Sequence, residues 1–324
     1  MPPAAKFPLA TTPSPLLDAP RLSAALGGPK ILIKRDDLTG RVLGGNKIRK
    51  LEYLLGDALS QGATHVVTGG GAQSNHACLT AVCARMAGLQ PVVVLSRPAT
   101  EAITGNLLIY RLLGMEPLFI DGYEPAALEA EMDAVCQRLR RQGHRPYFIP
   151  LGGSTAVGIL GYRDCLLEIV QQCSARGGQP RAIYTAVGTG GTLAGLVFGL
   201  SGSHVHTEVA GIDVGAIPGS PLPRIQHLLD QCGVAPASAR FSLDQGHIGP
   251  GYAQPGPDCL SAIRLFLATE GLLLDPVYTG KAAAGLVAHV QEGRFRPEDT
   301  LIFLHTGGAA GLFAIPALAE QVPN

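Results

Sequence analysis

The segment GGNKIRK at residues 44–50 places Lys47 and Lys50 in the first turn of a helix that the sequence predicts over residues 44–62. The positive end of the helix dipole lies at this turn and disfavours each cation by roughly a few tenths of a kcal/mol. A bound anion would remove that penalty. The two lysines lie on the same side of the helix, so one amine could bind a phosphate while the other does chemistry. A solvated basic surface is the alternative interpretation.

A Gly-rich loop with the sequence TGGGAQSNHA at residues 68–77 offers a second set of polar groups. Free backbone N–H groups at a helix start, together with the Ser74 hydroxyl and the amides of Gln73 and Asn75, suit a carboxylate or a phosphate. Taken alone, the loop favours a simple helix cap by Ser74 or Asn75.

Two further Gly-rich loops are VGTGGTLAG at residues 187–195 and HTGGAAG at residues 305–311. The first can direct several N–H groups and the hydroxyls of Thr189 and Thr192 onto one phosphate. It is not a dinucleotide-binding GxGxxG motif, because Leu193 occupies the place of the third glycine, and it lacks the Lys-Ser/Thr of a P-loop. The second suits close approach of the backbone to a flat ligand. Tight packing of a strand, a turn and a helix would explain the first loop as well, and a lone Gly-rich turn such as the second is weak evidence for a ligand.

The elements that must position these loops are short β-branched segments that alternate with helical patterns. The predicted strands cover residues 31–35, 64–70, 91–96, 117–121, 146–151, 182–187, 208–214 and 301–305. Alternation of strands and helices predicts an α/β protein with parallel-rich sheets and right-handed crossovers. Ligands bind beyond the carboxyl ends of such strands, which is where the Gly-rich loops lie.

Composition excludes several classes of partner. The 324 residues include 25 basic and 25 acidic side chains, so we expect neither nucleic acid nor a membrane surface as a partner, and a small neutral or zwitterionic ligand fits better. The uncharged residues 182–203 contain six glycines, which favours a strand, a turn and a buried helix over a membrane span. Seven cysteines without a CxxC pair, and no HExxH motif, indicate no metal. Prolines interrupt residues 1–20, so we expect a cytoplasmic protein without a signal peptide.

Six segments together resemble the D-cysteine desulfhydrase and 1-aminocyclopropane-1-carboxylate deaminase family. They are KRDDLTG at 34–40, GGNKIRKLEYLL at 44–55, GGGAQSNHA at 69–77, GTGGTLAGL at 188–196, LDPVYTGKAAAGL at 274–286 and HTGGAAGLFA at 305–314. These enzymes use pyridoxal 5′-phosphate (PLP) and have the two-domain tryptophan synthase β-like fold, PLP fold type II. The resemblance implies a discontinuous large cofactor-binding domain of residues 1–45 plus 155–324, a small inserted α/β domain of residues 46–154, and a homodimer.

The resemblance also assigns roles to individual residues. It implies that Lys47 forms the Schiff base with PLP and that Lys50 lies near the cofactor phosphate. It places the same phosphate at Gly188, Thr189, Gly190, Gly191 and Thr192. Asn75 would bond the ring hydroxyl, and Gln73, Ser74 and Asn75 would surround the substrate carboxylate.

Three positions near the end of the chain complete the implied site. Tyr252 and Tyr278 match the active-site tyrosines of the family. Thr279 falls at the position that contacts the pyridine nitrogen of PLP. The deaminases have a glutamate at that last position, which favours a protonated ring more than a neutral hydroxyl does. Thr279 therefore favours elimination of a good leaving group over ring opening. Cys78 and Leu79 depart from the family pattern, which leaves the substrate open, and Cys78 itself is expected to be a buried small residue.

The predicted reaction is α,β-elimination on a small amino acid, as in D-cysteine desulfhydrase, which gives pyruvate, ammonia and sulfide. Lys47 would remove the α-proton, and Ser74, Tyr252 and Tyr278 complete the predicted catalytic set. β-Replacement, elimination from cysteate or β-chloroalanine, and ring opening of 1-aminocyclopropane-1-carboxylate (ACC) are alternatives. A nicotinamide oxidoreductase, with Asp213 on the ribose, and a non-catalytic cofactor-binding protein are alternatives from other classes.

Overall fold

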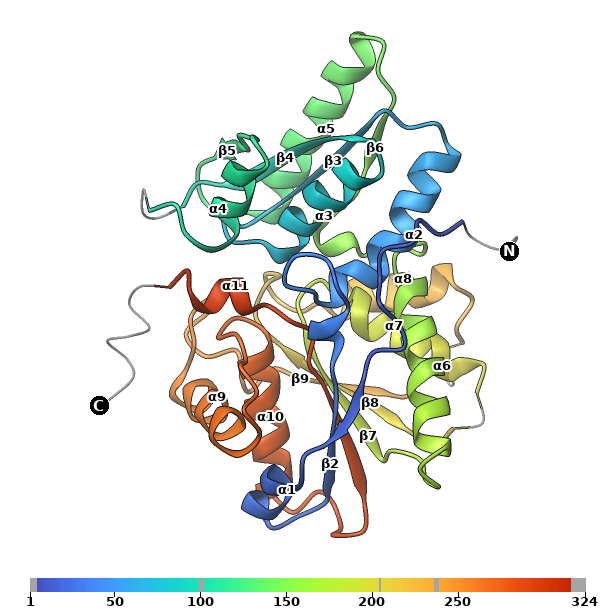
Figure 1. The fold of residues 1–324 in the computed structure, drawn as a ribbon, viewed down its shortest axis with the longest axis vertical. Helices are drawn as coiled ribbons and strands as arrows, with labels where there is room; N and C mark the ends of the chain where they lie inside the picture. Colours follow the sequence, from blue (N-terminus) through green and yellow to red (C-terminus); the bar gives the residue numbers. More distant parts are fainter. Residues whose placement is uncertain (1–4, 99–101, 204, 236–238, 316–324) are drawn as a thin grey trace.

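Two separate β-sheets form the centre of the molecule in a computed structural model that describes residues 5–98, 102–203, 205–235 and 239–315. Figure 1 shows the smaller sheet with its helices at the top of the view and the larger sheet below it. Helices flank both sheets, and nearly all strand pairs are parallel. The predicted α/β class with parallel-rich sheets is thus confirmed.

The larger sheet has the strand order β1-β2-β10-β7-β8-β9. Its strands are β1 (Leu16–Asp18), β2 (Lys30–Lys34), β10 (Thr300–Leu304), β7 (Ala182–Val187), β8 (Glu208–Asp213) and β9 (Phe241–Asp244). Strand β1 is antiparallel to β2, and the remaining pairs are parallel. All six residues of β7 are buried, because helices cover both faces of the sheet.

Helices α1, α9 and α10 cover one face of the larger sheet, and α6, α7 and α8 cover the other. Their bounds are Pro20–Leu26 (α1), Pro257–Glu270 (α9), Thr279–Gln291 (α10), Leu160–Ser174 (α6), Gly191–Ser201 (α7) and Leu222–Gln231 (α8). Leu32 and Ile33 of β2 belong to opposite hydrophobic cores, since successive side chains of a strand point to opposite faces.

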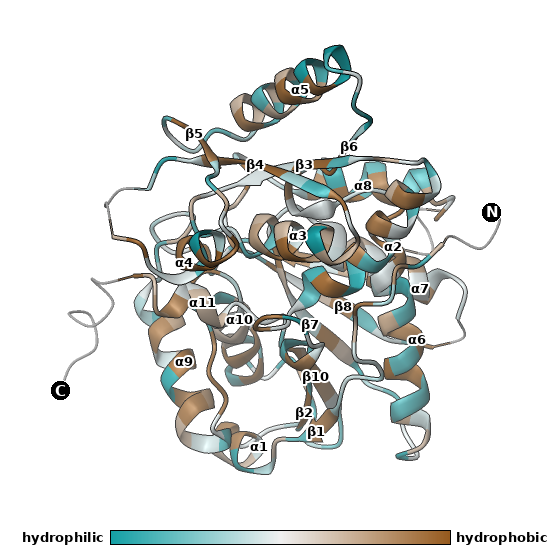
Figure 2. Ribbon diagram, turned by 45° about the horizontal axis from the view of Figure 1, so that its top comes forward, coloured by the Kyte–Doolittle hydropathy of each residue, from teal (hydrophilic) through white to brown (hydrophobic). Residues whose placement is uncertain are grey.

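The smaller sheet is fully parallel in the order β5-β4-β3-β6. Its strands are β5 (Leu118–Ile120), β4 (Gln90–Ser96), β3 (His65–Gly70) and β6 (Pro146–Phe148). Helix α5 packs on one face, and α2, α3 and α4 pack on the other. These helices span Pro125–Arg141 (α5), Asn46–Ser60 (α2), Asn75–Met86 (α3) and Gly105–Leu112 (α4). Hydrophobic and hydrophilic residues alternate along α5, as expected for a helix with one buried face (Figure 2).

The loops that follow β3, β7 and β10 lead directly into helices α3, α7 and α11 (Ala309–Leu312). Two short 3-10 turns, η1 (Asp36–Leu38) and η2 (Leu151–Gly153), follow β2 and β6 in the chain. The uncharged segment at residues 182–203 forms β7, a turn and α7. None of the helices in the described part of the chain has the length and apolar character that crossing a membrane requires.

The strands of the smaller sheet all lie between residues 65 and 148, and those of the larger sheet lie before and after this segment. We retain as a proposal the division into a large domain of residues 1–45 plus 155–324 and a small inserted domain of residues 46–154. Two sheets with separate hydrophobic cores support it.

Candidate active site

A cavity is lined by residues that belong to both sheets' helices and loops. Its lining includes most of the residues that the sequence predicts for a site, namely Lys47, Lys50, Ser74, Asn75, Gly188, Thr189, Gly190, Gly191, Thr192, Tyr252 and Tyr278. Gln73 lines an adjoining pocket that shares Ser74, Asn75 and both tyrosines. Thr279 is fully buried.

Lys47 and Lys50 lie in the first turns of α2, which begins at Asn46. Nζ of Lys47 donates to Oδ1 of Asn46 at 2.9 Å, and Nζ of Lys50 donates to the carbonyl oxygen of Gly152 at 3.2 Å. Burial lowers the pKa of Lys47 to about 8, although the carboxylate of Asp275 opposes this effect. Burial, with the nearby charges of Lys47 and Arg224, lowers the pKa of Lys50 well below its usual value. Burial is the main cause of both shifts.

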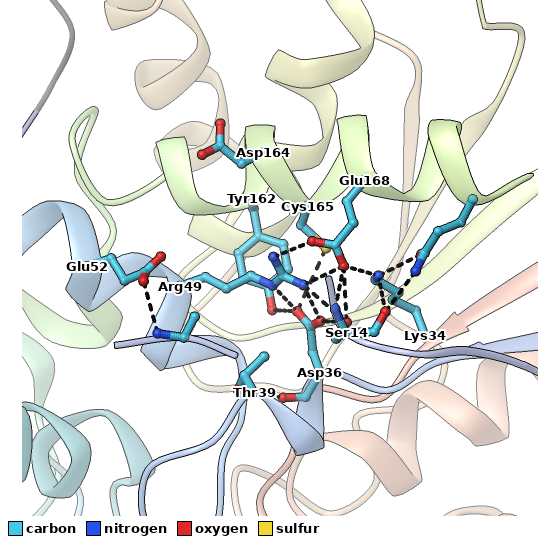
Figure 3. A network of polar contacts seen from close by, with 12 residues as sticks. Ser14, Lys34, Asp36, Thr39, Arg49, Glu52, Tyr162, Asp164, Cys165 and Glu168 are labelled. Carbon is cyan, nitrogen blue, oxygen red and sulfur yellow. Dashed lines mark hydrogen bonds and ion pairs between the residues drawn. The ribbon is translucent and has the colours of Figure 1, made fainter. Parts of the chain in front are cut away.

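Arg49 has a different role from its two neighbours, because it belongs to a buried ionic network (Figure 3). Its Nε and Nη2 donate to the two carboxylate oxygens of Asp36, each at 2.8 Å, and Nη1 donates to Glu168 at 3.0 Å. Burial opposes ionisation of Asp36, yet Arg49 and the hydroxyls of Tyr162 and Ser14 hold its pKa below the usual value. The network fastens α2 to β2 and α6, and so positions the two lysines.

The loop after β7 forms a cradle at the start of α7. Gly190 precedes this helix with φ of 85°, a conformation that favours glycine. A Cβ atom at Gly191 would lie 2.4 Å from Oγ of Ser154 and 2.8 Å from Nζ of Lys50. Oγ1 of Thr189 lies 2.7 Å from Oγ of Ser154, and Oγ1 of Thr192 accepts from the Asn46 amide at 2.9 Å. The N-terminus of α7, these hydroxyls and the amine of Lys50 thus line one part of the cavity.

The loop after β3 begins α3. Ser74 is the N-cap, and its Oγ accepts from the backbone N–H of Ala77 at 3.2 Å. The amide of Gln73 donates to the carbonyl of Thr104, and its oxygen accepts from the N–H of Asn106. The Asn106 amide also donates to Oδ1 of Asn75 at 2.8 Å. The buried Asn106, which the sequence analysis missed, therefore fixes Gln73 and Asn75, and the backbone N–H groups at the helix start remain the groups that suit an anion.

A pair of tyrosines faces the cavity from the larger sheet's side. The hydroxyls of Tyr252 and Tyr278 are 2.5 Å apart, and the ring of Tyr123 stacks on Tyr252 at 5.1 Å. Burial raises the pKa of Tyr252, and it raises the pKa of Tyr278 still further with the help of Tyr252. Both hydroxyls are therefore protonated at neutral pH and can donate a proton or a hydrogen bond.

Thr279 is held by Asp275, which the sequence analysis did not single out. Oγ1 of Thr279 accepts from the backbone N–H of Asp275 at 2.8 Å and donates to its Oδ1 at 2.7 Å. The Thr279 hydroxyl can therefore only accept from a further partner. Asp275 also accepts from the N–H groups of Val277 and Tyr278, and it lines the pocket that adjoins the cavity.

The two residues that depart from the family pattern are apolar neighbours in the small sheet's cores. Cys78 is 1% exposed, and burial raises the pKa of its thiol to about 12. It is therefore a packed small side chain and not a nucleophile. Leu79 is also buried and reaches the cavity lining.

Comparisons with known proteins agree on one family. The sequence profile of the pyridoxal-phosphate dependent enzymes matches residues 8–307. D-Cysteine desulfhydrases from two strains of Klebsiella pneumoniae are 42% and 40% identical over 322 residues, which is 95% of this chain and 96% of each relative. The crystal structure of an ACC deaminase homologue has a TM-score of 0.90 and 35% identity, and covers 98% of this chain and 96% of the other. The fold is also shared by the processed form of threonine deaminase isoform 2 from Solanum lycopersicum, with a TM-score of 0.65 and 19% identity over 92% of this chain and 80% of the other.

The cavity fits the cofactor of this family. PLP carries an aldehyde, which needs a neutral amine, and a phosphate, which needs positive charge and N–H donors. Lys47, with its lowered pKa, meets the first need, and Lys50 beside Gly191 at the start of α7 meets the second. The chain belongs to the pyridoxal-phosphate dependent enzymes, with the α/β architecture of PLP fold type II.

Proposed function

We propose that the protein is a PLP-dependent lyase that carries out α,β-elimination on a small amino acid, with D-cysteine as substrate. The observation that carries this proposal is the cavity itself, in which Lys47 lies with the Ser74 loop and with two protonated tyrosines. The D-cysteine desulfhydrases that are 40% and 42% identical over nearly the whole chain support the choice of substrate.

Different residues of the chain would carry out different steps of the reaction. Bound PLP withdraws electrons from the α carbon and so makes its proton acidic. The α3 N-terminus with Ser74 would hold the substrate carboxylate. The amine of Lys47 would remove the α-proton, and its lowered pKa of about 8 makes the neutral form more available than in an ordinary lysine. Tyr278 or Tyr252 would donate a proton to sulfur as the C–S bond breaks, and one water then converts the released enamine to pyruvate and ammonia.

Two observations bear on the alternatives. Thr279 presents a neutral hydroxyl and not a carboxylate, but its proton goes to Asp275, so it can only accept from the ring nitrogen and does not by itself separate elimination from ring opening. The same residues would serve elimination from cysteate or β-chloroalanine, and also β-replacement. Product release from a panel of amino acids is therefore needed to separate these reactions. A role for Asp213 on a nicotinamide ribose has no support, because its carboxylate is buried and accepts from the N–H of Gly215 and the amide of Gln245.

The proposal is tested by product release from D-cysteine, L-cysteine, cysteate, β-chloroalanine and ACC. We expect the holoenzyme to release pyruvate and sulfide in equal amounts from D-cysteine. A cofactor band that shifts with these amino acids while none of them gives pyruvate would contradict elimination, and 2-oxobutanoate from ACC would establish ring opening.

We further propose a cytoplasmic homodimer. Leu112 is 79% exposed at the end of α4, Phe313 is 71% exposed after α11, and the two helices contact each other. Large exposed apolar side chains on neighbouring helices are a feature of many interfaces. Sedimentation equilibrium of the holoenzyme would measure the assembly directly.

Substitution of Gly191 by alanine should weaken PLP binding. The new methyl group would displace Nζ of Lys50 or Oγ of Ser154, which it would approach to 2.8 and 2.4 Å. Loss of one charge-assisted hydrogen bond, worth about 1.5–3 kcal/mol, predicts that the dissociation constant of PLP rises by about tenfold or more. A titration of apo-protein with PLP measures this. Gly178→Ala is the control, because a Cβ there meets nothing within 4 Å, and equal affinities for both variants would contradict the cradle.

The rate at which PLP attaches covalently should depend on pH in a specific way. Only the neutral amine attacks the aldehyde, so the rate rises as pH increases through the pKa of Lys47. With that pKa at about 8, the rate should level off above roughly pH 8. An ordinary lysine would give a rate that still rises near pH 10. Stopped-flow absorbance after mixing apo-protein with PLP distinguishes the two profiles.

A further inference from the structure

A second polar cluster, formed by Asp244, His247 and His289, lies outside the lining of the cavity. Asp244 ends β9, His247 follows in the next loop, and His289 lies in the last turn of α10. Oδ2 of Asp244 is 2.7 Å from Nε2 of His289 and 3.8 Å from Nε2 of His247. Each residue offers a ligand atom within 4.8 Å of the other two.

The other polar atom of each of these three side chains already has its own partner. Oδ1 of Asp244 accepts from the N–H of Gly246 at 2.6 Å. Nδ1 of His247 lies 2.8 Å from the carboxylate of Asp258, and Nδ1 of His289 lies 2.8 Å from the hydroxyl of Tyr184. Histidines that bind metals nearly always donate their second ring N–H to a carboxylate or another oxygen. The outer contacts of a metal site are therefore in place.

We propose that Asp244, His247 and His289 bind a divalent transition-metal ion, and that Zn²⁺ suits this set of two imidazoles and one carboxylate. Ligands at Zn–N and Zn–O distances of about 2.0–2.1 Å in a tetrahedron are about 3.3 Å apart. The separations of 2.7 and 3.8 Å lie on either side of that value, so small side-chain rotations would complete the geometry. Water would supply the fourth ligand.

Charge and access are also compatible with an ion. The carboxylates of Asp244 and Asp258 together balance two positive charges. The side chains of Asp244 and His247 are 25% and 15% exposed, so an ion can enter from solvent. On binding, the proton between His289 and Asp244 would be released, since a ligating nitrogen must carry a lone pair. The ion would join β9, α10 and the loop that leads to Tyr252.

The test uses untagged holoenzyme that has been treated with a chelator and then equilibrated with Zn²⁺. Equilibrium dialysis with elemental analysis should give one Zn²⁺ per chain. Asp258→Asn, which removes only the outer contact of His247, should weaken binding by about 10–100-fold, and His247→Gln should weaken it more. His227→Gln is the matched control, because His227 is exposed on α8 and, among the described residues, its side chain bonds only that of Gln231.

Circular dichroism and the cofactor absorbance band establish that each variant is folded. Co²⁺ provides an independent readout, because its visible spectrum reports tetrahedral coordination, and this spectrum should be lost in His247→Gln. If wild type and a folded His247→Gln bind Zn²⁺ equally, the proposal is overturned, and the cluster is a hydrogen-bonded network only.

Discussion

Replacement of Lys47 by alanine is expected to reduce elimination from D-cysteine by at least about 10³-fold, because a positioned general base alone contributes about 10²–10⁴-fold. The variant should also lack the visible absorbance of covalently attached cofactor, since the buried amine of pKa about 8 is its proposed attachment point. Steady-state pyruvate release and an absorbance spectrum of the same sample measure both effects.

Two other lysines serve as controls for this experiment. Lys50→Ala should retain the visible band at saturating PLP but need more PLP to reach it, because the substitution removes the charge beside Gly191. Lys30→Ala removes an exposed amine that pairs with Asp18 on the surface, and it should change neither property. Normal turnover by Lys47→Ala would place the base elsewhere and contradict the proposed mechanism.

The sequence predicts the central strands and the loops of the site because their signals are local. Residues 182–187 are apolar and β-branched, and they form β7 with those bounds. Parallel strands bring their carboxyl ends to one edge of a sheet, so the loops after β3, β7 and β10 meet without any knowledge of side-chain contacts. The short edge strands β1 (LLD) and β9 (FSLD) escaped prediction, since neither contains a β-branched residue.

The contacts that hold the site residues could not be predicted, because they join distant segments. Asn106 fixes Gln73 and Asn75 from 33 and 31 positions away, and Asp275 fixes Thr279 through a contact that the segment 274–286 does not reveal by its sequence. Asp244, His247 and His289 come together only through the packing of β9 against α10 and the loop between them. No spacing rule relates His289 to Asp244, which lies 45 positions earlier in the chain.

Arg49 is the clearest example of a residue whose partners the sequence does not reveal. Next to Lys47 and Lys50 it has the appearance of a third cation for a bound anion. In the structure its partners are Asp36, 13 positions away, and Glu168, 119 positions away (Figure 3). The first turn of α2 thus combines two amines for the cavity with one guanidinium for the core.

Substitution of Arg49 by methionine should therefore destabilise the protein strongly. Methionine fills much of the volume, but it leaves the fully buried carboxylate of Asp36 without its counter-ion. Removal of one partner of a buried pair costs about 3–5 kcal/mol of the free energy of unfolding. Urea denaturation of the apo-protein, followed by circular dichroism, measures the loss.

Two comparisons separate the buried charge from a general packing defect. Adding Asp36→Asn to Arg49→Met removes the unpaired charge, so the double variant should be more stable than Arg49→Met alone. Arg97→Met breaks an exposed pair with Asp121, and it should cost no more than about 1 kcal/mol. If Arg49→Met were as stable as Arg97→Met, the ionic network would not be what fastens α2 to the larger sheet, and the lysines of the cavity would owe their positions to the apolar face of α2 alone.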